Sequence, residues 1–146
     1  MSSEKQVVVV LPFIKSRVLM QLRDFNSSID FPGRWGFFGG SIMDKETPEE
    51  AARRELFEEI GLHPDTLYKI NQTKIEGMDN CFSYAYGCPL TVPPERLVLK
   101  EGLDFVLATL EQVLSKTIYS VALKKHFPVI GIPYIPSTIS KLLESL

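Results

Sequence analysis

Residues 40–62 form the stretch that decides the fold, GSIMDKETPEEAARRELFEEIGL. Thr47 and Glu50 are spaced as a capping box, and Pro48 between them occupies the first helical position. Gly61 follows the acidic run and is typical of a residue that ends a helix. The stretch therefore predicts a helix that begins after Thr47 and ends at Gly61.

Three carboxylates share one face of this predicted helix. At about 100° per residue, Glu55, Glu58 and Glu59 fall within an arc of about 100°. Like charges at this spacing destabilise a helix, so a positive charge is expected over them. Oxygen ligands without Cys or His nearby suit Mg²⁺ or Mn²⁺ far better than zinc. The alternative is an acidic helix face that is simply solvated.

The stretch resembles the Nudix box, Gly-x5-Glu-x7-Arg-Glu-U-x-Glu-Glu-x-Gly-U, in which U is a bulky aliphatic residue. Lys45 stands where many members have glycine, at a position that the box does not specify. The resemblance implies an α/β fold, a Nudix-like α/β/α sandwich with a mixed β-sheet between helices. All nine specified positions are met, by Gly40, Glu46, Arg54, Glu55, Leu56, Glu58, Glu59, Gly61 and Leu62.

The resemblance also implies a metal site that uses the acids of the box. Glu58 and Glu59 are the first expected ligands of Mg²⁺ or Mn²⁺. Glu55 and the backbone carbonyl of Gly40 are expected to join them. A bound cation would lower the pKa of water and neutralise charge on the leaving group.

The other catalytic roles fall on residues around these ligands. Arg54 lies about 100° from Glu55 on the helix, so we expect it to orient carboxylates, together with Glu46, rather than bind metal. The general base is either Glu55 or Glu101, because family members take it from the box or from a later loop. A plain surface glutamate is the alternative role for Glu101.

Substrate contacts are predicted just before the box. Trp35 could stack a nucleobase, although aromatic residues at strand spacing more often lie in the core. Arg23 and Arg34 flank a loop and could hold phosphates, with solvated arginines as the alternative. Further stacking candidates are Phe31, Phe37, Tyr84 and Tyr86.

The rest of the chain predicts one domain, residues 1–146, in which strands and helices alternate. Thr109 opens a second capping box, and apolar residues from Ile139 to Leu146 recur at helical spacing. Residues 119–127 are also expected to be helical. Strands are expected near residues 6–11, 17–22, 35–38, 67–75, 80–86, 97–99 and 105–108.

Composition excludes several classes of protein. The formal charge of −2 shows no basic excess for extended nucleic acid, and no apolar run is long enough to span a membrane. Two cysteines, Cys81 and Cys88, cannot form a disulfide framework, which favours a reduced, cytoplasmic chain. The expected partner is a small-molecule nucleotide substrate. A homodimer is also compatible with the resemblance, although the sequence reveals no interface.

The function that the resemblance implies is metal-dependent hydrolysis of a nucleoside diphosphate linked to another moiety X, by attack of water at phosphorus. Within that reaction we favour a nucleoside triphosphate pyrophosphohydrolase, which releases monophosphate and pyrophosphate, because the chain is short. A nucleotide sugar, ADP-ribose or a dinucleoside polyphosphate would fit the same chemistry. An alternative of another class is a non-catalytic module that binds nucleotides or RNA ends.

Overall fold

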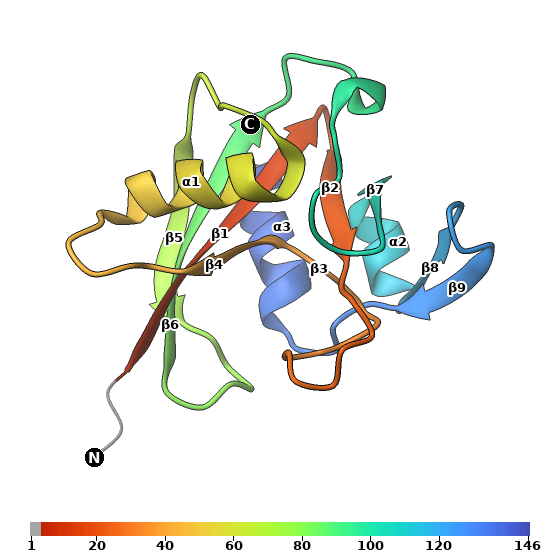
Figure 1. The fold of residues 1–146 in the computed structure, drawn as a ribbon, viewed down its shortest axis with the longest axis horizontal. Coiled ribbons are helices and arrows are strands. Elements are labelled where there is room, and N and C mark those ends of the chain that lie inside the picture. Colours follow the sequence, from red (N-terminus) through yellow and green to blue (C-terminus); the bar gives the residue numbers. More distant parts are fainter. Residues whose placement is uncertain (1–3) are drawn as a thin grey trace.

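The computed structural model describes residues 4–146, so three residues of the predicted domain lie outside the described range. Within residues 4–146, a seven-stranded sheet lies between helices, and a separate two-stranded sheet lies beside it (Figure 1). The strands are β1 (Lys5–Ile14), β2 (Arg17–Leu22), β3 (Trp35–Gly36), β4 (Phe38–Ser41), β5 (Tyr68–Lys74), β6 (Cys81–Pro89), β7 (Asp104–Ala108), β8 (Thr117–Ser120) and β9 (Lys125–Pro128). The helices are α1 (Pro48–Ile60), the 3-10 turn η1 (Pro94–Arg96), α2 (Leu110–Leu114) and α3 (Tyr134–Glu144).

The large sheet is mixed because its long central strands run in the same direction. β1 pairs in parallel with β6, whereas every other strand pair in this sheet is antiparallel. The other edge of β1 pairs first with β4 and then, from Phe13, with β2. Pro12 lies at this change of partner, where its missing N–H removes no bond to β4 or β2.

Each face of the sheet packs against a helix, with α1 in front and α3 behind in Figure 1. Alternate residues of β1 point to opposite faces, so Val8 and Val10 join the core under α1. Leu11 and Phe13 join the larger core under α3. The prediction of a mixed sheet between helices is therefore confirmed.

Two predictions for individual segments were wrong. Residues 119–127 contribute to the β8–β9 hairpin rather than to a helix, because burial alternates along β8, with Ile118 and Ser120 inward. Residues 97–99 form no strand, although Leu97 and Leu99 pack against the core under α1. None of the helices within residues 4–146 is long and apolar enough to cross a membrane.

Candidate active site

Helix α1 is capped at both ends, which fixes where the helix begins and ends. Thr47 Oγ1 accepts a hydrogen bond from the Glu50 N–H at 3.1 Å, and Glu50 Oε1 accepts one from the Thr47 N–H at 2.9 Å. At the other end, Gly61 has a φ of 69°, which glycine adopts without strain. The predicted boundaries of this helix are confirmed.

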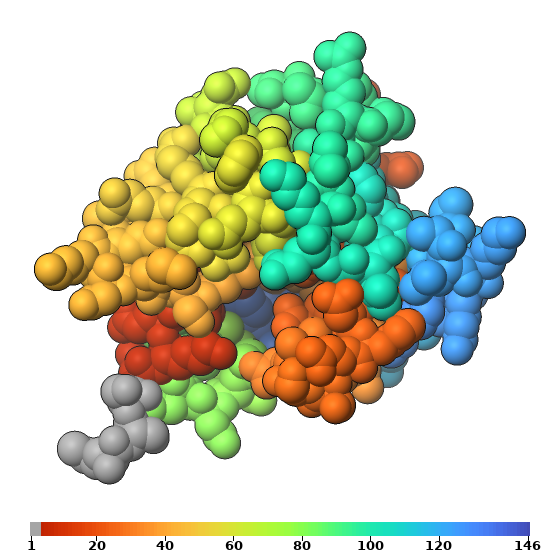
Figure 2. All heavy atoms as spheres, viewed as in Figure 1, coloured from red at the N-terminus to blue at the C-terminus, as the bar shows by residue number. Residues whose placement is uncertain are grey.

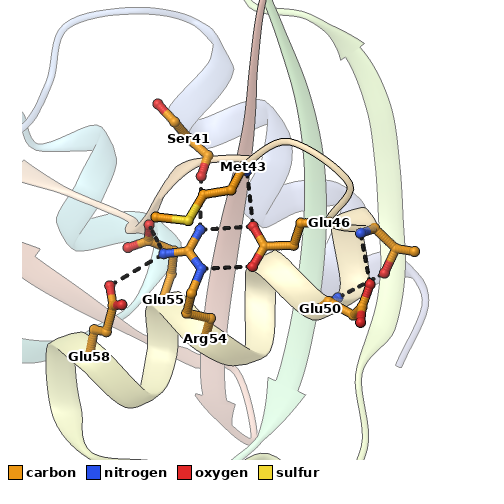
Figure 3. A network of polar contacts seen from close by, with 8 residues as sticks. Ser41, Met43, Glu46, Glu50, Arg54, Glu55 and Glu58 are labelled. Atoms are coloured by element: carbon orange, nitrogen blue, oxygen red, sulfur yellow. Dashed lines mark hydrogen bonds and ion pairs between the residues drawn. The ribbon is translucent and has the colours of Figure 1, made fainter.

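Arg54 stands at the centre of a polar network on α1 (Figure 3). Its Nε donates to Glu46 Oε2 at 2.7 Å and its Nη2 to Glu46 Oε1 at 2.9 Å, which is a bidentate pair. Nη2 also donates to the carbonyl of Ser41 at 3.0 Å. The bond from Arg54, together with the Met43 N–H, lowers the pKa of Glu46 to about 2. Arg54 thus ties the loop before α1 to the helix.

The same guanidinium also contacts two of the predicted metal ligands. Its Nη1 donates to Glu55 Oε1 at 2.9 Å and to Glu58 Oε2 at 3.3 Å. Arg54 thus contacts three carboxylates, and its role in orienting them stays a prediction. The Glu58 side chain is 53% exposed, and it does not line the cleft into which Glu55 points.

A cleft of about 280 Å³ brings three carboxyl groups together. Glu55 and Glu59 reach it from α1, and Glu101 reaches it from the loop before β7. Its other lining residues are Gln21, Arg23, Asp24, Ile29, Gly39, Gly40 and Gly102.

Glu59 is the most buried of these carboxyls, with only 3% of the residue exposed. Its Oε2 accepts a hydrogen bond from the Gly39 N–H at 3.0 Å. Burial first, then the negative charge of Glu55 and a hydrogen bond with Glu101, raise the pKa of Glu59 to about 9. Burial also raises the pKa of Glu55, against the opposing effect of Arg54. The cleft therefore holds more acidic groups than nearby positive charge can neutralise.

Gly40 leaves room for this cluster. A Cβ atom at position 40 would collide with Glu55 Oε1 and lie 2.6 Å from Glu55 Cδ, closer than Cβ atoms come to other heavy atoms. The first glycine of the box therefore allows the Glu55 carboxylate to lie directly against the backbone of β4.

The donor chemistry of the cleft fits a hard divalent cation. Its candidate ligands are oxygen atoms, from Glu55, Glu59 and Glu101 and from the backbone of Gly40. As these side chains stand, no three His, Cys, Asp or Glu residues in the described part of the chain form a group that could hold a metal ion. The structure thus brings Glu55 and Glu59 together as expected, adds Glu101, and leaves Glu58 outside.

Glu101 reaches the cleft because its loop is attached to β2. The Gln21 side-chain amide donates to the Glu101 carbonyl at 2.9 Å, and the Leu103 N–H donates to the Leu22 carbonyl at 2.8 Å. Gly102 has a φ of 88° and packs tightly against Gln21. Gln21 was missed from the sequence, since nothing in its strand pattern distinguishes it from an ordinary polar residue.

The three predicted substrate-binding residues have different surroundings. Trp35 is 0% exposed and its indole N–H donates to the buried carbonyl of Ile118 at 3.0 Å, so the prediction that it stacks a nucleobase is contradicted. Arg34 borders a separate hollow near α2. Arg23 lines the acidic cleft, and its Nε donates to the Asp30 carbonyl at 2.7 Å.

A second cavity adjoins the cleft and was not expected from the sequence. The two cavities share Arg23, Gly39 and Gly40, and most of the second one is apolar. Phe31 and Phe37 line it, whereas Tyr84 and Tyr86 do not. Its lining comes from β1, β4, β6, α3 and the loops between them, so no local pattern reveals it.

The chain is similar in sequence to known hydrolases. The chain is 45% identical over 78 residues to an oxidized purine nucleoside triphosphate hydrolase of Danio rerio, a match that covers 52% of the chain and 47% of the relative. The chain thus spans about half the length of the curated relatives that it matches first.

Solved structures share the whole fold at low sequence identity. The NUDIX domain of Shewanella oneidensis NrtR in complex with ADP ribose matches with a TM-score of 0.73 and 18% identity, over 99% of the chain and 90% of that structure. The E. coli dihydroneopterin triphosphate pyrophosphohydrolase matches with a TM-score of 0.71 and 18% identity, over 99% of the chain and 100% of that structure. A family model described as NUDIX domain matches residues 4–120. With most of its length matched, this chain belongs to the NUDIX domain family.

Proposed function

We propose that this protein hydrolyses a nucleoside diphosphate linked to a further group X, with help from a divalent cation. The observation that carries the proposal is the set of three carboxyl groups, Glu55, Glu59 and Glu101, in one cleft. The reaction would take place in the cytoplasm, where thiols such as the free Cys81 and Cys88 remain reduced.

Nudix hydrolases generally use divalent metal cations, and we propose Mg²⁺ or Mn²⁺ for this protein. Glu55, Glu59 and the Gly40 carbonyl would hold the cation. Glu58, the further ligand that the box predicts, would have to turn from Arg54 towards the cleft to join them. When bound, the cation would neutralise negative charge on the phosphates and lower the pKa of the attacking water. Arg54, fixed by its two bonds to Glu46, would keep the Glu55 carboxylate turned towards the cleft.

We propose Glu101 as the general base. Glu55 gives one carboxylate oxygen to Arg54 and is already proposed to hold the cation, so its carboxylate is less free to contact the attacking water. Glu101 lies at the same cleft and is hydrogen-bonded to Glu59 instead. From there it could take a proton from the water that attacks phosphorus.

The favoured substrate class is a nucleoside triphosphate, converted to monophosphate and pyrophosphate. The relative from Danio rerio is named for hydrolysis of such a compound, and the E. coli structure is named a triphosphate pyrophosphohydrolase. The ADP ribose bound to the Shewanella oneidensis domain supports the second candidate, a diphosphate linked to a sugar. Dinucleoside polyphosphates belong to the same second group.

A substrate panel tests the proposal. The full chain is incubated with nucleoside triphosphates, ADP-ribose, nucleotide sugars and dinucleoside polyphosphates, with Mg²⁺, with Mn²⁺ and with a chelator. We expect release of nucleoside monophosphate that the chelator abolishes and that Glu59→Gln lowers by at least about 100-fold.

Glu49→Gln is the matched control, because Glu49 is an exposed acid on the same helix that pairs with Arg53. It should leave the rate unchanged. Full activity in Glu59→Gln would refute the assigned site. Tight binding of a nucleotide without any turnover would favour the non-catalytic module instead.

A further inference from the structure

The apolar cavity opens beside the acidic cleft. Figure 2 shows a hollow between the first residues of β1 (red), the loop after β2 (orange) and the turn between β5 and β6 (green). The cavity measures about 190 Å³. Its apolar lining consists of Val7, Val8, Val9, Phe31, Phe37, Ile75, Met78, Ile130, Ile132 and Ile135.

Phe31 reaches this cavity from a strained loop. Its φ is 52°, a region that bulky residues rarely adopt. The loop is fixed on both sides of Phe31, because Arg23 Nε donates to the Asp30 carbonyl and the Gly33 N–H donates to the carbonyls of Arg23 and Asp24. A strained backbone that surrounding bonds hold in place often marks a functional position. Here it places an aromatic side chain in the wall of the cavity.

The nitrogen- and oxygen-bearing side chains that line the cavity are those of Lys5, Arg23, Asp30, Ser41 and Tyr134. Lys5 and Asp30 are exposed and lie 4.0 Å apart, as a pair on the surface. The Tyr134 hydroxyl is hydrogen-bonded to Ser83, and burial raises the pKa of Tyr134 to about 12. Among the described lining residues there is no Asn, Gln, Glu or buried Asp side chain. Apart from Arg23, whose Nε is already bonded to the Asp30 carbonyl, and the exposed Ser41, the side chains therefore offer little that could read donors and acceptors on the edge of a nucleobase.

We infer that this cavity takes the planar ring of the substrate by stacking on Phe31 and by shape, without reading the pattern of hydrogen-bonding groups on the ring edge. The inference rests on the proposed hydrolase function. An oxidised purine differs from the ordinary one in these edge groups. Apolar pockets reject a changed polar group weakly, whereas a pocket built to hydrogen-bond it can discriminate by about 10⁴-fold or more. This protein would therefore hydrolyse oxidised and ordinary purine nucleoside triphosphates with similar efficiency, unlike a hydrolase dedicated to the oxidised form.

The first experiment compares kcat/KM for dGTP and 8-oxo-dGTP with the full chain and Mg²⁺. We expect the two values to agree within about 10-fold. A preference of about 1,000-fold or more for either compound would overturn the inference. If neither compound is hydrolysed, their dissociation constants are measured with Mg²⁺ present, and these should also agree within about 10-fold. Failure of both compounds to bind would overturn the inference as well.

The second experiment separates the Phe31 ring from its unusual backbone. Phe31→Asn keeps a residue that tolerates positive φ but removes the ring, and should raise KM for both compounds about 10-fold or more with little change in kcat. Phe31→Tyr retains an aromatic face and should keep KM close to that of the unmodified chain. An unchanged KM in Phe31→Asn would refute the stacking role. If no form of the protein, including the unmodified chain, hydrolyses any nucleotide of the panel, the proposed hydrolase function itself is contradicted.

Discussion

Replacing Glu59 with glutamine should remove a pH dependence from the stability of the metal-free protein. The pKa of Glu59 rises from 4.5 to about 9 on folding, chiefly because the carboxyl is buried. Between these values the folded chain keeps a proton that the unfolded chain has released. Folding therefore becomes less favourable as the pH rises, and the stability present below about pH 4.5 is progressively lost towards about pH 9.

The size of the effect follows from proton linkage. One group that is protonated only in the folded state costs about 1.4 kcal/mol per pH unit. From pH 6 to pH 8 the free energy of unfolding should thus fall by about 2 to 3 kcal/mol through Glu59. Glutamine cannot ionise, and its amide oxygen can still accept the bond from the Gly39 N–H. The stability of Glu59→Gln relative to the unmodified chain should rise by the same amount over this range.

Urea denaturation at pH 6, 7 and 8, with a chelator present, measures this difference. Glu49→Gln is the control, because the Glu49 side chain is 57% exposed, and its stability should run parallel to that of the unmodified chain. Parallel curves for Glu59→Gln and the unmodified chain would refute the reasoning. Mg²⁺ at 100 times its dissociation constant should add about 2.7 kcal/mol to the unmodified chain at pH 8. It should add much less to Glu59→Gln.

Three further substitutions test the surroundings of the cleft. In Gly40→Ala the new Cβ would collide with the Glu55 carboxylate, so kcat should fall at least about 10-fold; unchanged kcat would show that the position of Glu55 does not depend on a glycine here. Arg54→Lys replaces the bidentate bond to Glu46 and should lower kcat about 10- to 100-fold in steady-state assays, and full activity would exclude a positioning role. Trp35→Phe removes the donor to a buried carbonyl and should cost about 1 to 3 kcal/mol in urea denaturation with KM unchanged. A clear rise in KM would restore Trp35 as a substrate contact.

Local sequence signals were sufficient for helix α1 and the pair Glu55 and Glu59. The cap residues Thr47 and Gly61 act through neighbouring backbone groups, so their effect can be read without knowing the tertiary structure. Helical spacing likewise places the acids on one face. Helical spacing does not predict which side of that face packs against the sheet. The packing of α1 against β1 and β4 buries Glu59 and leaves Glu58 exposed.

Contacts between distant segments were beyond the reach of the sequence. Trp35 has the position expected of a stacking residue, but the residue that accepts its N–H bond, Ile118, lies 83 positions away. Glu101 could be named as a candidate because family members can take their base from a later loop, yet only the bond from Gln21 in β2 shows how it reaches the cleft. The hairpin at residues 119–127 was missed because its four-residue strands are too short for a clear alternating pattern.

The proposed hydrolysis and the proposed binding of the substrate ring would take place in two cavities that are built by different parts of the chain. The acidic cleft depends on α1 and on Gly40, whereas the apolar cavity is completed by Phe31 and by the turn before β6. Loops tolerate changes in sequence and shape more readily than a helix that is capped at both ends. The part of the substrate that a Nudix domain recognises can therefore change through its loops while the acids of α1 stay in place. In this protein Arg23 borders both cavities, and its bond to the Asp30 carbonyl joins the position of the Phe31 loop to the site where phosphates would lie.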